Sequence, residues 1–279
     1  MRAIVLGAAG QLGAELTRLI GQDSGVSREG VSVTDERAID ALLRDRRPAI
    51  VFNCAAYNAV DRAETESDLA YAVNADGPAN VARVCARYRI RLVHFSTNFV
   101  FDGAMRRPYV ESDPPAPLSV YGSSKLKGEQ MVMEVMPEAL VIRTSAVFGD
   151  VGSAIKGGSF PGRIVARATR GESLRVVADQ KVNPTYAGDL APAAMKLAED
   201  GIHGLVHLVA AGCAGWDEFA RAALKECGVT AEMEAALSSE MASPAARPLN
   251  GCLESTRVAA LRPWREGLHA WALKRAAKA

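Results

Sequence analysis

Three glycines at three-residue intervals lie between the first apolar run of the chain and its first helical pattern. Gly7, Gly10 and Gly13 follow the apolar residues 3–6, and Leu12 begins a series of leucines at helical spacing. Gly7 permits a tight exit from a strand, Gly10 lets backbone N–H groups approach a pyrophosphate, and Gly13 lets helix and sheet pack closely. The arrangement predicts a dinucleotide-binding βαβ unit.

Short apolar runs and helical patterns continue to alternate after this unit. Strands are predicted at 49–55, 91–97 and 140–147, with a helix that begins at Thr34 or Asp35 and ends before Pro48, and a helical stretch over 67–88. Such alternation predicts an α/β fold with a doubly wound, Rossmann-like parallel sheet and right-handed crossovers. We expect an NADP-binding domain over 1–150 and a smaller mixed substrate domain over 151–279, with a strand near 174–190 returning to the sheet.

The second half of the chain shows a looser pattern. Glycines crowd residues 149–162, which predicts a long loop in which Ser153 and Lys156 close over a ligand. Residues 231–246 match no element. The remaining predictions are helices at 161–170, 189–198, 216–227, 255–261 and from 264 to the end, and strands at 174–177 and 205–209.

Composition excludes several classes of function. Lys and Arg number 33 against 32 Asp and Glu, and no basic run indicates a nucleic-acid partner. No apolar stretch approaches the roughly 18 residues that cross a bilayer. The 5 cysteines are scattered, which argues against a disulfide framework or zinc site and favours a reducing, cytoplasmic location. The 4 histidines lack metal-ligand spacing, so they are interpreted as satisfied structural residues and no metal is predicted.

The end of the predicted second strand bears on the choice of cofactor. An acid there normally binds the free ribose 2'-hydroxyl of NAD, and a basic residue accommodates the 2'-phosphate of NADP. Ser27 carries no charge to repel a phosphate, and Arg28 can bind one through two N–H groups. NADPH is therefore favoured over NADH, with a solvated surface arginine as the alternative interpretation.

A tyrosine and a lysine four residues apart follow a strand that ends in two hydroxyl residues. Tyr121 and Lys125 share one face of a predicted helix, and Ser96 and Thr97 end the strand before it. Either pattern alone has an ordinary explanation, as a chance spacing or a strand-end hydrogen bond. Because the carboxyl ends of parallel strands gather at one crevice, we expect these groups to meet beside the glycine turn.

This set of residues suits the reduction of a carbonyl group. Hydride addition to the carbonyl carbon leaves negative charge on oxygen, which needs a proton and hydrogen-bond donors. Tyr121 is the candidate proton donor, and we expect the ammonium of Lys125 to lower its pKa toward neutral. Thr97, helped by Ser96, is the candidate second donor to the same oxygen.

Longer motifs surround these residues. They are Gly7-Ala-Ala-Gly10-Gln-Leu-Gly13, Asn53-Cys-Ala-Ala-Tyr57-Asn-Ala-Val-Asp61-Arg-Ala-Glu64, Ser96-Thr97-Asn98-Phe99-Val100-Phe101-Asp102-Gly103, Val120-Tyr121-Gly-Ser-Ser-Lys125-Leu-Lys-Gly-Glu129, Arg143-Thr-Ser145, Val177-Ala-Asp-Gln180, Pro184-Thr185 and Arg247-Pro248. With them in place, the chain resembles, nearly end to end, the extended short-chain dehydrogenase/reductase superfamily and within it the dTDP-4-dehydrorhamnose reductase family.

The resemblance implies an NADPH-binding sheet, a small sugar-nucleotide domain and reduction of C4 in a dTDP-4-keto-6-deoxyhexose. It implies that Tyr121 and Lys125 contact the cofactor as well as acting in catalysis. Some rhamnose reductases that resemble this chain bind magnesium through glutamates; Glu15 could match one such ligand, without a second ligand to join it. Besides the glycines, it places eight further residues around the cofactor: Gln11, Leu12, Ser32, Val33, Ala55, Ala56, Tyr57 and Phe95.

Departures from the family pattern fall near the sugar. Asn98 and Phe99 stand where the family usually has Asp and Tyr, Asn58 stands for a Thr, and Ala146 occupies a position often held by Trp. A methyl group in place of an aromatic wall enlarges the pocket, so the identity of the sugar stays open. The predicted substrate-binding residues are Asn58, Ser96, Thr97, Asn98, Tyr121, Ala146 and Arg247, the last for the pyrophosphate.

Three alternatives remain at this point. A dehydratase or epimerase would need an acid or base beside Thr97, which Asn98 and Phe99 do not supply. The second alternative is a non-catalytic NADP-binding subunit, because the regulatory beta subunit of methionine adenosyltransferase resembles the same family. A reductase of another nucleotide-linked keto sugar is the third. The base, the stereochemistry at C4 and the formation of a homodimer also stay open.

Overall fold

A six-stranded parallel sheet forms the centre of the computed structural model, which describes residues 2–151 and 158–277. Its strand order is β10-β5-β4-β3-β1-β2, and every neighbouring pair runs parallel. The carboxyl ends of the strands therefore share one edge, as predicted. The strands are β1 (Ala3–Leu6), β2 (Gly25–Val26), β3 (Ile50–Asn53), β4 (Arg91–Thr97), β5 (Leu140–Thr144) and β10 (Gly204–His207).

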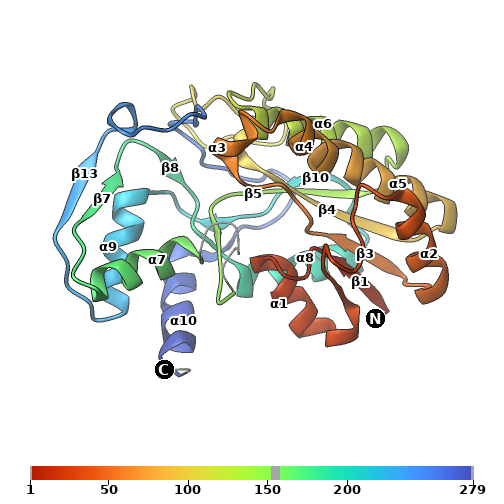
Figure 1. Cartoon of the computed structure of the whole chain (residues 1–279), viewed down its shortest axis with the longest axis horizontal. Helices are drawn as coiled ribbons and strands as arrows, with labels where there is room; N and C mark the ends of the chain where they lie inside the picture. Colours follow the sequence, from red (N-terminus) through yellow and green to blue (C-terminus); the bar gives the residue numbers. More distant parts are fainter. Residues whose placement is uncertain (1, 152–157, 278–279) are drawn as a thin grey trace.

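Helices cover both faces of this sheet (Figure 1). On one face α1 (Gln11–Ile20) and α8 (Ala187–Glu199) pack over a core that includes Leu16 and Leu190. The other face carries α2 (Glu36–Arg46), α5 (Gly77–Tyr88) and α6 (Val120–Val135). Strands buried on both faces need apolar side chains throughout, which is why β3 and β5 are nearly continuous apolar runs. The predicted doubly wound sheet is confirmed.

The start and end of α2 follow ordinary capping chemistry. The carboxylate of Asp35 accepts a hydrogen bond from the N–H of Ala38 at 3.0 Å, which satisfies one of the helix's free donors. Arg47 takes a left-handed conformation after the last turn, and Pro48 cannot continue the helix. The predicted start of this helix is confirmed to within one or two residues.

The link between β3 and β4 contains the helical stretch that was predicted over 67–88. It consists of α4 (Ser67–Tyr71), a π-helical turn (Ala72–Asp76) and α5 without a break, and the short helix α3 (Val60–Ala63) precedes it. A π-helical turn inserts one extra residue into a helix and often accompanies a functional site. Here it contains Asn74, whose side chain is fully buried.

A smaller lobe lies beside the sheet, at the left of Figure 1. Its core includes Phe148, Phe219 and Trp271, packed among helices and short strand pairs. The helices are α7 (Phe160–Thr169), α9 (Trp216–Glu226) and α10 (Trp264–Ala276). The pairs are β6 (Val147–Phe148) with β9 (Thr185–Tyr186), β7 (Leu174–Val177) with β13 (Met233–Ala236), β8 (Lys181–Val182) with β12 (Ala214–Gly215), and β11 (Ala210–Ala211) with β14 (Leu261–Pro263). Residues 22–24, 98–100 and 238–240 form 3-10 turns.

Three sequence predictions for this half are wrong. The strand that returns to the central sheet is β10, whereas the strands within 174–190 pair with β6, β12 and β13. The strand expected over 140–147 divides into β5 and β6, because Ala146 has a φ of 43°. No helix forms at 255–261: the hydroxyl of Ser255 accepts hydrogen bonds from the N–H groups of Arg257 and Val258, which replaces helical bonding.

Two cysteines are paired, which the scattered cysteine positions did not predict. Cys213 and Cys252 form a disulfide, with Cα atoms 6.0 Å apart and a sequence separation of 39. Only the fold brings them together, so their spacing gave no signal.

The helices within residues 2–151 and 158–277 include none with the length and apolar character of a transmembrane span.

Candidate active site

The glycine turn joins β1 to α1, and its glycines are required by close backbone contacts. A Cβ on Gly13 would lie 2.2 Å from the carbonyl oxygen of Gly7. A Cβ on Gly7, whose φ is 79°, would lie 2.6 Å from the amide nitrogen of Ala55. Gly10 is the N-cap of α1 and provides no side-chain cap, so the first N–H groups of the helix stay available to an anion. The predicted strand-turn-helix is confirmed.

The surroundings of this turn fit a dinucleotide. Gln11 begins α1, and its side-chain oxygen is buried with no partner among the described residues. Leu12 is buried behind it, and the N–H of Ala55 donates to the side chain of Asn53. A buried carbonyl oxygen without a donor is expected where a polar ligand completes the site.

The end of β2 reaches the glycine turn through the main chain. The carbonyl oxygen of Val26 accepts hydrogen bonds from the N–H groups of Gly7 and Ala8, at 3.0 and 3.2 Å. Arg28 follows two residues later and is exposed. Its guanidinium is thus free to meet a 2'-phosphate, and the assignment of Arg28 stays a prediction.

The other predicted cofactor residues line the segments after β2 and β3. The hydroxyls of Ser32 and Thr34 lie 2.8 Å apart, and Val33 is buried against Gly77. Tyr57 is buried, and both its backbone N–H and its carbonyl bond to the side chain of Asn74 at 2.9 Å. Ala56, half-buried, lies between Ala55 and Tyr57. These residues border the same edge of the sheet as the glycine turn.

Thr97, Tyr121 and Lys125 meet at the carboxyl end of β4. Ser119 caps α6, which places Tyr121 in its first turn and Lys125 one turn later. The ammonium of Lys125 is buried and donates to the carbonyl oxygen of Phe95 at 2.6 Å. The Thr97 hydroxyl lies near the Tyr121 phenol and acts to lower its pKa. The predicted convergence of a phenol, an ammonium and a hydroxyl is therefore found.

The electrostatics of this group differ from the expectation. Burial raises the pKa of Tyr121, and the Thr97 hydroxyl acts in the opposite direction. Burial also lowers the pKa of Lys125 from 10.5 to about 8, while the charge of Glu129 acts to raise it. The expected lowering of the phenol's pKa by Lys125 is absent, because the ammonium is directed at the Phe95 carbonyl.

A buried ion pair joins α6 to β5. Arg143 donates three hydrogen bonds to the carboxylate of Glu129 at 2.7 to 3.1 Å, and its guanidinium lies 5.1 Å from the ring centre of Phe101. His94 is fully buried, and burial together with the charge of Lys125 lowers its pKa well below 6.5, so its ring is neutral. Its Nδ1 atom bonds to the side-chain nitrogen of Asn53 at 3.3 Å, while its Nε2 atom has no partner among described residues, so the expectation of a satisfied histidine holds for one of the two ring nitrogens.

Three predicted sugar-binding residues carry buried polar atoms with no partner in the described chain. They are the hydroxyl of Ser96, the side-chain oxygen of Asn58 and the side-chain nitrogen of Asn98. Gly251 lies against Asn98, since a Cβ on that glycine would come within 2.2 Å of the amide nitrogen. Such atoms are expected where a polyhydroxylated ligand binds.

Ala146 and Phe99 shape the neighbourhood of these atoms. Ala146 follows β5 in a left-handed conformation, and its carbonyl oxygen accepts a hydrogen bond from the N–H of Thr185. The Phe99 ring contacts Tyr121 edge-on, with ring centres 5.4 Å apart.

Arg247 belongs to a strap, residues 243–251, that crosses from the smaller lobe to the sheet. Its guanidinium forms an ion pair with Asp61 at 2.7 Å, on the segment that also carries Asn58. Gly103 packs beneath the strap, where a Cβ would lie 2.6 Å from the N–H of Leu249. The structure therefore brings Arg247 to the side of the site where Asn58 lies.

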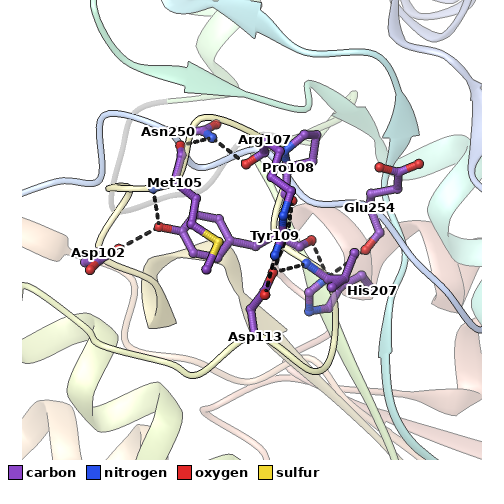
Figure 2. Close-up of polar contacts among 10 residues, drawn as sticks. Asp102, Met105, Arg107, Pro108, Tyr109, Asp113, His207, Asn250 and Glu254 are labelled. Carbon is purple, nitrogen blue, oxygen red and sulfur yellow. Dashed lines mark hydrogen bonds and ion pairs between the residues drawn. The ribbon is translucent and has the colours of Figure 1, made fainter.

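The strap is held by the loop that follows β4 (Figure 2). The side chain of Asn250 donates to the carbonyls of Met105 and Arg107, both at 2.8 Å. The Tyr109 hydroxyl donates to Asp102 at 2.6 Å, and the His207 ring bonds to the Tyr109 carbonyl. These contacts join residues far apart in sequence.

Several residues with evident roles at the site were not identified from the sequence. Asn74 fixes Tyr57 and donates to the hydroxyl of Ser124, and its only signal was a polar residue inside a helical stretch. Glu129 gave a better signal, because it follows Lys125 by one helical turn. Gly251 gave none, because its role depends on Asn98 lying beside it.

Two further predictions concern a metal and a covering loop. Glu15, the candidate magnesium ligand, contacts the cationic groups of Arg18 and Lys274 at 2.7 and 3.6 Å. Within the described ranges no group of three or more His, Cys, Asp or Glu side chains is arranged to hold a metal ion. Ser153 and Lys156 lie outside the described residues.

Comparison with known proteins gives a consistent result. The family model described as the RmlD substrate binding domain matches residues 1–276. The chain is 37% identical over 280 residues to a probable dTDP-4,6-dihydroxy-2-methyloxan-3-one 4-ketoreductase of Streptomyces antibioticus, covering 96% of this chain and 93% of that protein. It is 38% identical over 284 residues to a dTDP-4-dehydrorhamnose reductase of Mycobacterium tuberculosis, covering 96% and 91%.

Solved structures agree with the sequence comparisons. The dTDP-4-dehydrorhamnose reductase of Bacillus anthracis, solved in complex with NADP, superposes with a TM-score of 0.92 at 31% identity. The match covers 98% of this chain and 99% of that one.

Proposed function

Because this chain belongs to the RmlD substrate binding domain family, we propose that it is an oxidoreductase that uses NADPH to reduce the C4 keto group of a dTDP-linked 4-keto-6-deoxyhexose. The similarity to dTDP-sugar ketoreductases along nearly the whole chain supports both the reaction and the substrate class. The similarity to a structure solved with NADP supports the cofactor.

The convergence of Thr97, Tyr121 and Lys125 carries this proposal. Thr97 and Lys125 are buried and Tyr121 is half-buried at the carboxyl end of β4, where the Thr97 hydroxyl lies near the Tyr121 phenol. Unsatisfied polar atoms on Ser96, Asn58 and Asn98 border the same place. This is the arrangement required to bind a polar carbonyl compound and protonate its oxygen.

The protein supplies the proton and holds the developing charge. The phenol of Tyr121 donates its proton to the carbonyl oxygen, and Thr97 donates a hydrogen bond to the same atom. The high pKa that burial gives Tyr121 keeps the phenol protonated and ready to donate. Ser96 and Asn98 bind sugar hydroxyls, and Arg247 binds the pyrophosphate.

The cofactor is held by the glycine turn and the neighbouring strand ends. The N–H groups at the start of α1 bind its pyrophosphate, and Arg28 binds the 2'-phosphate. Tyr121 and Lys125 contact it from α6. When bound, NADPH supplies the hydride that adds to the carbonyl carbon.

Cofactor binding and sugar-nucleotide binding are assigned to different parts of the chain. We assign cofactor binding to residues 1–150, with α8 and β10 completing that sheet, and sugar-nucleotide binding to much of 151–279. A cytoplasmic location and a homodimer stay predictions; light scattering of the purified protein checks the latter.

Elimination or epimerisation is disfavoured at this site. Either reaction needs an additional acid or base beside Thr97. The side chains at the next two positions, Asn98 and Phe99, do not exchange protons at neutral pH. Reduction is the reaction that the residues present can complete.

A turnover assay tests the proposal. Purified protein is mixed with NADPH or NADH and a panel of nucleotide-linked 4-keto-6-deoxyhexoses, and loss of reduced cofactor is followed with product identification. We expect turnover with a dTDP-linked sugar and a preference for NADPH. Tight NADPH binding without turnover of any sugar would instead support a non-catalytic subunit.

A further inference from the structure

Three acidic residues within a six-residue segment each contact a different part of the site. We define the acidic segment as residues 61–66, which contains Asp61, Glu64 and Glu66. We propose that it is a positioning element, in which Glu64 fixes Tyr121 through the start of α6 and Asp61 fixes Arg247 through the strap. The proposal rests on the proposed function, because it assigns roles relative to the same catalytic and pyrophosphate-binding residues.

Glu66 anchors the segment to the cofactor side. The hydroxyl of Tyr57 donates to its carboxylate at 2.5 Å. The guanidinium of Arg62 donates to the other carboxylate oxygen at 2.7 Å, across one turn of chain. The backbone of Tyr57 is in turn fixed by Asn74. The acidic segment therefore has a defined position relative to the buried residues after β3.

Glu64 contacts the first turn of the catalytic helix. Its carboxylate accepts a hydrogen bond from the N–H of Val120 at 2.9 Å, and Val120 directly precedes Tyr121. A carboxylate at a helix N-terminus satisfies a free donor and interacts favourably with the helix dipole. The contact spans 56 residues of sequence, so it fixes α6 relative to another part of the fold.

The start of α6 also has no room to shift on its other side. A Cβ on Gly122 would lie 2.3 Å from the carbonyl oxygen of Phe99, two residues after Thr97. Close packing on one side and the Glu64 contact on the other set the direction in which the Tyr121 phenol points. Without Glu64, the first turn of α6 can move away from Thr97.

Asp61 gathers the strap on the substrate side. Its carboxylate accepts hydrogen bonds from the hydroxyl of Ser243 at 2.8 Å and the N–H of Ala245 at 3.3 Å. It also accepts one from the guanidinium of Arg247 at 2.7 Å. Asp61 lies in α3 on the sheet side, so these contacts tie the smaller lobe to the segment that begins at Tyr57.

The contacts of Arg247 orient its guanidinium and leave some of its N–H donors available to a ligand. Within the ranges that the structure describes, it donates once to Asp61, once to the Ser243 hydroxyl and once to the Ala245 carbonyl. An arginine has five N–H donors in a fixed plane, so donors remain for a pyrophosphate. Asp61 therefore sets the plane in which they are presented.

Single substitutions separate the two roles. Glu64→Ala is expected to lower kcat by about 10-fold or more, because small misplacements of a catalytic group are costly, with KM for both substrates unchanged. Glu64→Gln keeps an oxygen acceptor for the Val120 N–H and is expected to restore most of the rate. Asp61→Ala is expected to raise KM for the sugar nucleotide by about 10-fold, with kcat and KM for NADPH unchanged.

Asp68→Ala is the matched control. Asp68 is an exposed acid in α4, two residues beyond the acidic segment, and its carboxylate forms no hydrogen bond or ion pair with the described residues. The Asp68→Ala variant removes one negative charge from the same region as the Asp61→Ala and Glu64→Ala variants. Kinetic constants of this variant are expected to equal those of the parent protein. Thermal unfolding and circular dichroism of all variants report whether each is folded.

Several results would overturn the proposal. Variants at Glu64 and Asp61 that behave like Asp68→Ala show that the segment positions nothing. A Glu64→Ala rate that falls only with the folded fraction, or that Gln fails to restore, shows a purely structural contact. A lower KM in Asp61→Ala shows that Asp61 competes with the substrate instead. A parent protein that reduces no nucleotide sugar contradicts the proposed function itself, a result distinct from these.

Discussion

The cofactor side and the sugar side of this site are built by different kinds of structure. The cofactor side consists of strand ends and the glycine turn, whose positions are set by the backbone ladder of a parallel sheet. The sugar side consists of irregular segments, the loop 102–113 and the strap 243–251, which side chains such as Asn250 join to one another. The difference teaches that one side is fixed by the main chain and the other by individual side chains.

Two glycines make the contrast concrete. Gly13 and Gly251 both lie so close to a neighbour that an added Cβ would come within 2.2 Å. At Gly13 that neighbour is the backbone of Gly7, which cannot move without disturbing the turn. At Gly251 it is the end of the Asn98 side chain, which can rotate. Substitutions on the two sides should therefore fail in different ways.

The largest expected effect separates two tyrosines. Tyr121→Phe removes the proposed proton donor and should lower kcat by about 100-fold or more, with NADPH affinity and thermal stability unchanged. Tyr109→Phe removes the same atom from the sugar side, where the hydroxyl bonds to Asp102, and should cost about 1 kcal/mol of stability with little change in kcat. Kinetics and urea unfolding of both variants test this. Equal losses of kcat would contradict the division.

The glycine pair gives the next largest effect. Gly13→Ala should abolish measurable NADPH binding or folding, because its methyl group meets backbone. Gly251→Ala should leave NADPH binding intact and raise KM for the sugar nucleotide about 10-fold, since a displaced Asn98 costs roughly one hydrogen bond to the substrate. Calorimetric titration with NADPH and steady-state kinetics distinguish them. Normal sugar binding by Gly251→Ala would place Asn98 outside the pocket.

Removing a strap anchor should have a moderate effect on stability. Asn250→Ala loses two side-chain hydrogen bonds to carbonyls and leaves those groups without their donor, at a cost of about 1–3 kcal/mol. Asn80→Ala is the matched change on the cofactor side, where the side chain donates once to the carbonyl of Val33. Urea unfolding of both variants measures the difference. A smaller loss for Asn250→Ala than for Asn80→Ala would contradict the dependence of the strap on side chains.

The smallest expected effect is a pH dependence on the sugar side. Burial alone raises the pKa of Glu111, but hydrogen bonds from Ser255, Thr256 and the His207 N–H outweigh it and lower the pKa from 4.5 to about 2. A carboxyl with a lowered folded-state pKa stabilises the fold above pH 4.5, and that contribution disappears as the pH falls toward 2.

Glu111→Gln should therefore weaken the fall in unfolding free energy over that acid range. Glu134→Gln, at an exposed glutamate of α6 that forms no ion pair with the residues the structure describes, serves as the control and should behave like the parent protein. Denaturant unfolding at a series of pH values makes the measurement. An identical acid dependence in Glu111→Gln and the parent would show that the Glu111 contacts contribute nothing.

Sequence patterns predicted the regular elements of both the sheet and the lobe better than the irregular segments, for a physical reason. The strand at 91–97 matches β4, and the helix expected over 216–227 matches α9, because each buries a regular apolar pattern. The segment 255–261 has a helical pattern, yet the hydroxyl of Ser255 and the carboxylate of Glu111 bind its backbone N–H groups. A distant acceptor of that kind leaves no local signal.

The residues of the site could be predicted to a similar extent: positions set by topology were predicted, and contacts between distant segments were not. Tyr121, Lys125 and Thr97 could be placed together from topology alone, since parallel strand ends gather at one edge. The direction of the Lys125 ammonium, which points at the carbonyl oxygen of Phe95, could not be predicted, because it depends on a buried acceptor in another segment. Gly251 and Asn74 depend on contacts between segments far apart in sequence, which periodicity cannot report.

The order of strands across the central sheet has a consequence for synthesis. The edge strand beyond β5 is β10, which ends at His207, after much of the smaller lobe has already been made. A nascent chain that has emerged only as far as β5 therefore presents an open strand edge, a template for association with other chains. The ribosome must deliver some sixty further residues, 145–207, before that edge is closed.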